Sequence, residues 1–461
     1  MADGGMAAVP HAPGRLPLLG HAWPLMRDPL NFVKSLRESG DLVRVDLGGL
    51  PVVFVTNASL VHEVLVTKAR FISKGRLFSR MTPLVGGGLA TADGQEHRRH
   101  RRLIQPTFHH RRLAGYGEIM AARARELADA WRPGQRVDMV QEMGEFAIVT
   151  LASTMFASDL GEQAVKAVRR DIPVILQTML TRAVLPPALD RLPVPPNRRF
   201  LAASARLRKV IDDVIKDTRA SDDEHPDLLS MLLAARDADT GEALTDEEVR
   251  DELGTMLFAG TETTASTFAW TFHELARHPE VERRVLEEID EVVGDRQVTF
   301  ADMSRLTYLR QVLDEVIRLH GVTLLMRRTA QPVELGGVEL PEGTEIAFSL
   351  YALHLDPRLY PEPERFDPDR WSPEQRAERP REAFVAFGAG NRKCIGDEFS
   401  WTEIMITLAT VLPRWRFRPV PGVTVREETA AMARPKSVPM IVEPRAERAP
   451  GSAESPGLRA S

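Results

Sequence analysis

The stretch Phe387-Gly388-Ala389-Gly390-Asn391-Arg392-Lys393-Cys394-Ile395-Gly396 contains the one cysteine of this 461-residue chain. Glycines surround the thiol, and an apolar, helix-forming stretch from Phe399 to Leu412 follows. We therefore expect Cys394 at or just before a helix N-terminus, where unpaired N–H groups and the helix dipole favour the thiolate. A thiolate ligates metals, so Cys394 is either a metal ligand or a small buried structural residue.

The residues around Cys394 suit a flat, anionic cofactor. Glycine lets the backbone approach such a group closely, Phe387 can pack over the loop, and Arg392 is a cation suited to a carboxylate. The stretch resembles the cytochrome P450 signature Phe-x-x-Gly-x-x-x-Cys-x-Gly, which is complete at Phe387, Gly390, Cys394 and Gly396. The resemblance implies a haem-thiolate mono-oxygenase that uses O₂ and haem b, with Cys394 as the axial ligand of the iron.

Composition indicates a globular protein with a large core. The chain is 43% hydrophobic and 27% charged, and a net charge of −5 with a pI near 6.2 gives no sign of nucleic-acid binding. The apolar run from Leu16 to Met26 is too short and too polar to span a bilayer. A single cysteine excludes an intramolecular disulfide and fits a reducing compartment, so we expect a cytoplasmic protein, working as a monomer.

The pattern along the chain predicts a mainly α fold with a minor β lobe. Strand-like segments at 42–55 and 333–350 are expected to share a small sheet, and most of the remainder has helical periodicity. Residues 1–25 are expected to be flexible, 26–445 to form a single domain, and 446–461 to be a disordered tail. The resemblance implies the cytochrome P450 fold, with haem between an oxygen-binding helix and the cysteine-ligand loop.

Glu315 and Arg318 lie three residues apart on a predicted helix, so their side chains share a face and can pair. An ordinary surface ion pair would have the same spacing, but the apolar neighbours favour burial. A buried pair needs further partners to offset its desolvation. The resemblance implies that Arg365, in Pro-Glu-Arg-Phe, completes a structural triad with these two residues.

The segment His97-Arg98-Arg99-His100-Arg101-Arg102 is rich in cations and would by itself be typical of a solvated helix face. The resemblance implies a second role, because haem carries two propionates and His97 and Arg101 lie one helical turn apart. Arg392 and Arg327 are expected to complete this propionate clamp. Arg328 remains open as the alternative to Arg327.

The run Ala259-Gly260-Thr261-Glu262-Thr263-Thr264 lies within a long predicted helix, where glycine and several threonines are unfavourable. One explanation is a harmless distortion in which threonine hydroxyls bond back to carbonyls. The resemblance implies function instead. Ala259 would lie against the haem, Gly260 would make room for dioxygen, Thr263 would organise water, and Glu262 would relay protons.

The substrate and the electron donor are implied by the resemblance alone. Over the whole chain it extends to bacterial sesquiterpene oxidases that convert epi-isozizaene through albaflavenol to albaflavenone in terpenoid antibiotic biosynthesis. Electrons would come from NAD(P)H through a ferredoxin reductase and a ferredoxin that docks near Cys394, on Lys393 and the basic residues 98–102. The chain reads Leu319-His320-Gly321-Val322 where the family commonly has Leu-x-Pro, which puts the shape of the substrate-facing segment 322–326 in doubt.

Two other functions remain open. Asp222, Asp223 and Asp227 loosely resemble the aspartate-rich motif with which class I terpene synthases hold Mg²⁺ and a prenyl diphosphate such as farnesyl diphosphate. The alternative for this acidic loop is a cap on the following helix. A haem-binding module without mono-oxygenase activity is the other possibility, although the acid–alcohol pair Glu262 and Thr263 argues against it.

Overall fold

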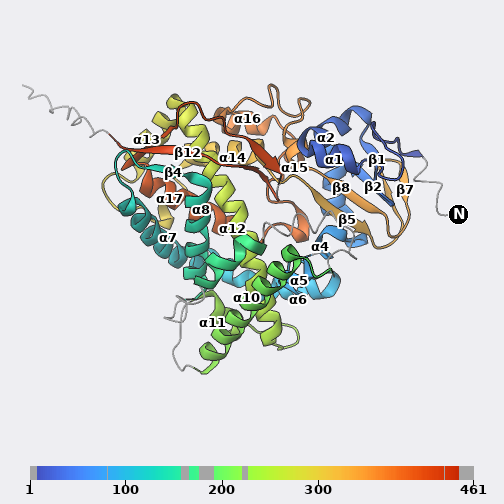
Figure 1. Cartoon of the computed structure of the whole chain (residues 1–461), viewed down its shortest axis with the longest axis horizontal. Helices are drawn as coiled ribbons and strands as arrows, with labels where there is room; N and C mark the ends of the chain where they lie inside the picture. Colours follow the sequence, from blue (N-terminus) through green and yellow to red (C-terminus); the bar gives the residue numbers. More distant parts are fainter. Residues whose placement is uncertain are drawn as a thin grey trace, which may run out of the picture.

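The computed structural model describes residues 8–79, 81–156, 166–175, 192–220, 227–429 and 431–445. Helices dominate these residues, and a smaller β region lies on one side of them, which confirms the predicted fold class (Figure 1). The expected tail at 446–461 lies outside the described residues. Among the helices that are described, none is long and apolar enough to cross a membrane.

The β lobe contains a five-stranded sheet in the order β1-β2-β8-β5-β3. Strands β1 and β2 form the predicted hairpin, and β2 pairs in parallel with β8. The two distant β segments therefore share a sheet, as expected. Residues 333–340 are the exception, because they form a separate hairpin of β6 and β7. The bounds are β1 Leu42–Leu47, β2 Leu50–Val55, β3 Ile72–Lys74, β5 Leu325–Thr329, β6 Val333–Leu335, β7 Val338–Leu340 and β8 Glu345–Phe348.

The other strands belong to the helical part. A three-stranded sheet has the order β4-β12-β9, and β10 pairs with β11 in a hairpin. Their bounds are β4 Arg136–Asp138, β9 Trp415–Pro419, β10 Glu427–Thr429, β11 Ala433–Pro435 and β12 Pro439–Pro444. The α-helices are α1 Ala22–Arg27, α2 Pro29–Ser35, α3 Ala58–His62, α4 Arg76–Ser79, α5 Thr82–Val85, α6 Gly94–Ile104, α7 His110–Ala130, α8 Met139–Met155, α10 Pro195–Ala220, α11 Leu228–Ala234, α12 Asp246–Arg277, α13 Pro279–Val292, α14 Thr307–Leu319, α15 Leu350–His354, α16 Pro373–Ala377 and α17 Asp397–Val411.

Helix α12 is the central helix of the molecule, with α8 packed along it (Figure 1). It begins with a capping box, in which the Thr245 hydroxyl accepts from the Glu248 amide and the Glu248 carboxylate accepts from the Thr245 amide. Its first turn is acidic, which complements the positive end of the helix dipole. The cap and the packing keep this long helix continuous through its poor helix formers.

The N-terminal segment differs from the prediction, because residues 8–25 are not a loose end. Val9 and Ala12 are buried in two hydrophobic clusters of the β lobe. The Ala12 amide donates to the Arg44 carbonyl at 2.9 Å, and Gly20 pairs with Leu47 on the edge of β1. The segment has no apolar period, so its order comes from contacts that become visible only in the folded chain.

Candidate active site

The Cys394 loop leads directly into α17, with Gly396 as the N-cap of the helix. The Cys394 amide donates to the Phe387 carbonyl at 2.9 Å, and the ring of Phe387 packs against Trp401 with centroids 5.3 Å apart. Gly390 has φ +69°, and a Cβ there would overlap the Leu65 carbonyl oxygen. The signature glycine is therefore required by a close backbone approach to the helix at 63–67.

The thiol itself differs from the sequence prediction. Cys394 is accessible to solvent, yet protein atoms crowd it, so desolvation raises its pKa and the Asp397 carboxylate adds to the shift. The charges of Arg101 and Lys393 act in the other direction without overcoming burial. Accessibility combined with desolvation fits a side chain on the wall of an enclosed site. The thiolate then depends on a bound metal ion, whose charge deprotonates a coordinating thiol.

Basic side chains gather near the loop. Arg327 is buried, whereas Arg328 is turned outward with half of its side chain exposed. Of these two arginines, Arg327 is therefore the better candidate for the clamp. Arg101 donates to the Lys393 carbonyl at 2.6 Å, which ties α6 to the cysteine loop. Arg392 pairs with Asp93, the residue that caps α6. The residues predicted as a propionate clamp therefore converge from three separate elements.

Lys74 is a further member of this cluster that no motif in the sequence indicated. It lies on β3 directly opposite Arg327 on β5. Burial, together with the charges of Arg392 and Arg327, lowers the pKa of Lys74 to about 7. Only the register of two short strands reveals it.

The cluster carries more positive charge than the carboxylates around it. Burial and the charges of Lys74 and Arg392 lower the pKa of His97 to about 4. Burial and Arg392 likewise lower the pKa of Arg327 to about 10, with Asp93 as an opposing charge. Buried cations that repel one another are stabilised by an anion. The two carboxylates of a haem therefore fit this set of donors.

The run from Ala259 to Thr264 forms the middle of α12, where most neighbouring residues are buried but Ala259 is exposed. The Thr263 hydroxyl donates back to the Ala259 carbonyl at 2.8 Å, as the distortion hypothesis anticipated. The Thr264 and Ser400 hydroxyls lie 3.3 Å apart and connect this turn to α17, the helix after Cys394. An accessible stretch of α12 therefore lies beside the cysteine helix.

Gly260 has a packing role that the sequence did not predict. A Cβ at this position would lie 2.9 Å from Cδ2 of Leu151 on α8. The glycine thus lets α8 approach α12 closely. The predicted space for dioxygen is a separate proposal that this contact does not test.

Glu262 lies beneath the hairpin of β10 and β11. Its carboxylate accepts a hydrogen bond from the Ala431 amide, and Arg434 and Glu428 of the hairpin act on it electrostatically. Burial outweighs these effects and raises the pKa of Glu262. One of its oxygens is buried without a hydrogen-bond partner among the described residues. A desolvated carboxyl with a raised pKa is suited to taking up and releasing a proton.

Glu315 and Arg318 form a fully buried, bidentate ion pair, with N–O distances of 2.7 and 2.8 Å. Arg318 also donates to the carbonyls of His354, Pro363 and Arg365. Glu315 also accepts from the Asp367 amide at 2.9 Å and from the Trp371 indole at 3.0 Å. The pair is thus embedded in hydrogen bonds that offset its desolvation.

The third member of the triad differs from the prediction. The Arg365 side chain is exposed and pairs with Glu362, so Arg365 contributes only its carbonyl. The second guanidinium at Glu315 comes from Arg370, whose Nε lies 3.4 Å from the carboxylate. Arg365 precedes the 3-10 helix Pro368–Trp371, whereas Arg370 lies within it. That short helix turns the Arg370 side chain toward Glu315.

The predicted magnesium site at Asp222, Asp223 and Asp227 finds little support in the described residues. Asp222 and Asp223 lie outside the described residues, and the Asp227 carboxylate accepts from the Ser230 amide at 2.7 Å as the N-cap of α11. No group of three or more potential metal ligands occurs within the described ranges. The helix-cap explanation therefore accounts for Asp227.

The substrate-facing segments are described in part. Met326 belongs to the core of the β lobe, so its apolar side chain is explained by packing. At the missing proline, His320 stacks on Trp270 with ring centroids 3.7 Å apart, and Val322 bridges to Met432. The turn is thus held by the stacked ring and the β10–β11 hairpin.

Comparison with known proteins agrees with this site. The cytochrome P450 family model matches residues 10–441. Cyclooctat-9-en-7-ol 5-monooxygenase from Streptomyces melanosporofaciens is 43% identical, over 94% of this chain and 95% of the relative. Pentalenene oxygenase from Streptomyces avermitilis is 38% identical, over 97% and 98%. The crystal structure of the cytochrome P450DA heme domain superposes with a TM-score of 0.85 at 26% identity, covering 95% of this chain and 98% of that one.

The chain belongs to the cytochrome P450 family, and its class of activity is that of a P450 mono-oxygenase. A haem bound through Cys394 would supply the oxygen activation, because thiolate ligation favours O–O cleavage. The accessible thiol, the excess of buried cations and the glycine-lined loop all fit that group.

Proposed function

We propose that this protein inserts one oxygen atom from O₂ into a C–H bond of a terpene hydrocarbon. The relatives named above carry terpene substrates in their names, and they match this chain over nearly its full length. The observation that carries the proposal is the accessible stretch of α12 at Ala259 and Thr263, linked to the cysteine helix through Thr264 and Ser400. Dioxygen and substrate would meet on this wall.

The roles of the chain's own residues follow from their surroundings. Cys394 would ligate the iron, while His97, Arg101, Arg327, Arg392 and Lys74 would hold the propionates. Thr263 can release its bond to the Ala259 carbonyl and donate toward the reacting oxygen, since the Oγ lies on the accessible face. Glu262 holds a proton at its buried carboxyl and passes it toward Thr263.

The substrate proposal can be made specific by the resemblance to sesquiterpene oxidases. Epi-isozizaene, oxidised through albaflavenol to albaflavenone, is the first compound to test, and pentalenene is the matched comparison. Both are hydrocarbons that offer no polar group, so pocket shape decides between them.

The proposed electron source is NAD(P)H through a ferredoxin reductase and a ferredoxin that docks beside Cys394. Arg98 is exposed, and so is Lys393, which pairs with Asp397. Arg99 and Arg102, in contrast, form ion pairs with the 237–248 segment. Arg98 and Lys393 are therefore the better candidates for contact with an acidic ferredoxin.

The test combines the haem-loaded protein with a ferredoxin, its reductase, NADPH and each hydrocarbon, and measures NADPH consumption and oxygenated product. Substrate-dependent consumption with a product one oxygen atom heavier would support the proposal. Haem reduction without oxygenation of any terpene would reject the substrate class. A protein that binds haem but consumes no NADPH with any substrate would instead be a silent haem carrier.

A further inference from the structure

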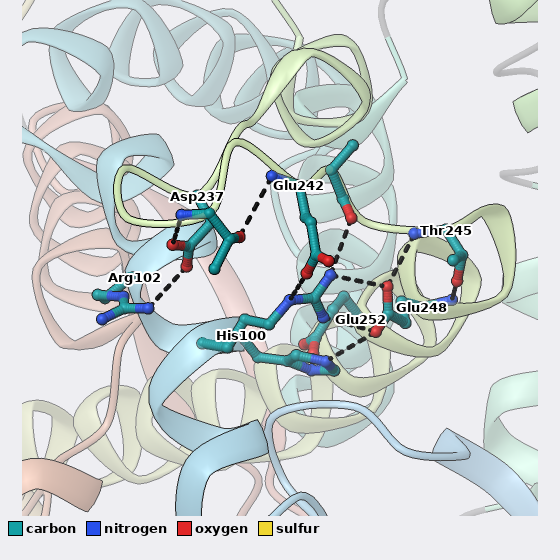
Figure 2. A network of polar contacts seen from close by, with 10 residues as sticks. His100, Arg102, Asp237, Glu242, Thr245, Glu248 and Glu252 are labelled. Atoms are coloured by element: carbon teal, nitrogen blue, oxygen red, sulfur yellow. Dashed lines mark hydrogen bonds and ion pairs between the residues drawn. The ribbon is translucent and has the colours of Figure 1, made fainter.

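A buried histidine on α6 lies between two carboxylates of α12 (Figure 2). His100 Nδ1 is 2.7 Å from Glu252 Oε1, and His100 Nε2 is 3.4 Å from Glu248 Oε1. His100 and Glu252 are almost completely buried. The three side chains therefore form one continuous chain of polar contacts between the helices.

The geometry determines the protonation state of the ring. Both ring nitrogens face carboxylate oxygens, and an ionised carboxylate accepts hydrogen bonds but donates none. With both carboxylates ionised, each ring nitrogen carries a hydrogen and His100 is an imidazolium. Burial raises the pKa of Glu252, so that carboxyl can take up the Nδ1 proton. Burial alone would lower the pKa of His100, but the hydrogen bond and charge of Glu252 outweigh it and raise the pKa.

One end of this chain reaches solvent. The Glu248 side chain is 26% exposed and pairs with Arg99 at 2.7 Å. Arg99 also faces Glu242 across the preceding loop (Figure 2). A proton from water can thus reach the Glu248 carboxylate without entering the protein.

The other end is buried and incompletely paired. Glu252 Oε2 and the Thr255 hydroxyl are buried without hydrogen-bond partners among the described residues. Lys74 acts electrostatically on Glu252, and the Leu89 amide lies near the carboxylate. Thr255 is one helical turn before the accessible Ala259. Along α12, the unpaired Thr255 hydroxyl therefore comes between Glu252 and the wall of the proposed oxygen site.

A purely structural ion pair would explain the contact between His100 and Glu252, but not the unpaired Glu252 Oε2 and Thr255 hydroxyl. Buried charges are costly to desolvate, and replacing them by apolar residues is often neutral or stabilising. Unsatisfied polar atoms add to that cost unless water occupies them. A chain that begins at solvent and ends in unpaired oxygens has the layout of a proton path.

We propose that Glu248, His100 and Glu252 relay protons from solvent into the haem pocket. In each passage His100 gives its Nδ1 proton to Glu252, and Nε2 keeps its own proton as the ring turns to neutral. A turn of the neutral ring about its Cβ–Cγ bond then points the unprotonated Nδ1 toward Glu248, whose carboxyl, protonated from solvent, gives it a proton. The reverse turn restores the starting contacts. The net change is one proton moved inward, with no electron transferred. The inference rests on the mono-oxygenase activity, which consumes protons, and not on the choice of substrate.

The deciding variant is Glu252→Gln, because the amide keeps the volume and a hydrogen-bond acceptor but neither takes up nor releases a proton at pH 7. Glu282→Gln is the matched control, since Glu282 is also buried, pairs with Arg416 and Arg418, and lies on α13. The measurements are product formed per NADPH, its pH profile, and the carboxyl region of the infrared difference spectrum on haem reduction in H₂O and D₂O.

We expect Glu252→Gln to reduce product per NADPH about tenfold at neutral pH, at the lower range for loss of a proton-transfer group. A carboxyl band that shifts in D₂O should be present in the wild type and the control but absent in Glu252→Gln. Unchanged coupling, pH profile and infrared spectrum in Glu252→Gln would overturn the relay.

The mono-oxygenase activity is measured separately, by the red-shifted Soret band of the reduced carbon monoxide complex and by the oxygenated product of the wild type. If Glu252→Gln does not fold, the wild-type infrared spectrum decides. A carboxyl band that follows the pH and is lost in His100→Gln supports the relay, and its absence from the wild type overturns it.

Discussion

Replacing Arg370 with alanine should destabilise the protein far more than replacing Arg365. Arg370 is almost fully buried, its Nε lies 3.4 Å from Glu315, and it donates to the Glu362 carbonyl at 2.8 Å. The Nε–Glu315 contact is an ion pair only, because Arg370 Nε has no hydrogen-bond partner among the described residues. The hydrogen bond from the charged guanidinium to the Glu362 carbonyl contributes about 1.5–3 kcal/mol. Glu315 keeps its bidentate bond to Arg318, so the loss stays below the roughly 3–5 kcal/mol expected for an unpaired buried charge. We expect Arg370→Ala to lower the free energy of unfolding by about 2–3 kcal/mol.

Arg365→Ala is the matched control for this prediction. Its side chain is 61% exposed and its partner Glu362 is 72% exposed, so the expected loss is below about 0.5 kcal/mol. The carbonyl that Arg365 offers to Arg318 is unaffected by the substitution. Urea unfolding of the haem-loaded variants, followed by circular dichroism, measures the difference. A loss for Arg365→Ala equal to or larger than that for Arg370→Ala would refute the assignment of Arg370 to the triad.

Four further outcomes test the site. Cys394→Ser should abolish the red-shifted Soret band of the reduced carbon monoxide complex, and a retained band would exclude Cys394 as the ligand. Thr263→Ala should divert NADPH consumption toward peroxide, by roughly tenfold or more, as expected for loss of a proton-delivery group; unchanged product yield would contradict its role. Arg392→Ala should weaken haem retention about tenfold, the value of one charged hydrogen bond, measured by haem transfer to apomyoglobin; equal retention would remove it from the clamp. Arg99 and its neighbours lower the pKa of Glu248 to about 2, so the stability from this carboxylate is present above pH 4.5 and is lost as the pH falls toward 2. Glu248→Gln should therefore flatten the dependence of the free energy of unfolding on pH across that window. An unchanged pH dependence would contradict the pairing.

Local spacing was sufficient for features formed within one element. The position of Cys394 before a helix follows from the glycines and the apolar stretch after it, and α17 begins at Asp397. The Glu315–Arg318 contact follows from a three-residue spacing on α14. The threonine back-bond in α12 follows from the intrinsic chemistry of its hydroxyl.

Contacts that form between separate helices and strands could not be predicted from local spacing. Lys74 joins the cationic cluster only because β3 pairs with β5 in one register. Arg370 replaces Arg365 because a short 3-10 helix reverses which side chain faces Glu315. The Cys394 pKa rises because tertiary packing removes water from the thiol, an effect that outweighs the helix terminus.

The parallel pairing of β2 with β8 has a consequence for how the chain folds during synthesis. The paired strands are separated by about 290 residues, and a ribosome adds about 5–20 residues per second. The β1–β2 hairpin must therefore wait roughly 15–60 s with an open edge before its partner emerges. Lys74 and Arg327 meet through the same sheet, so the proposed propionate clamp forms only after β5 has been synthesised. Haem capture would then follow the synthesis of β5, and a nascent chain stalled before β5 should accumulate as an aggregation-prone form.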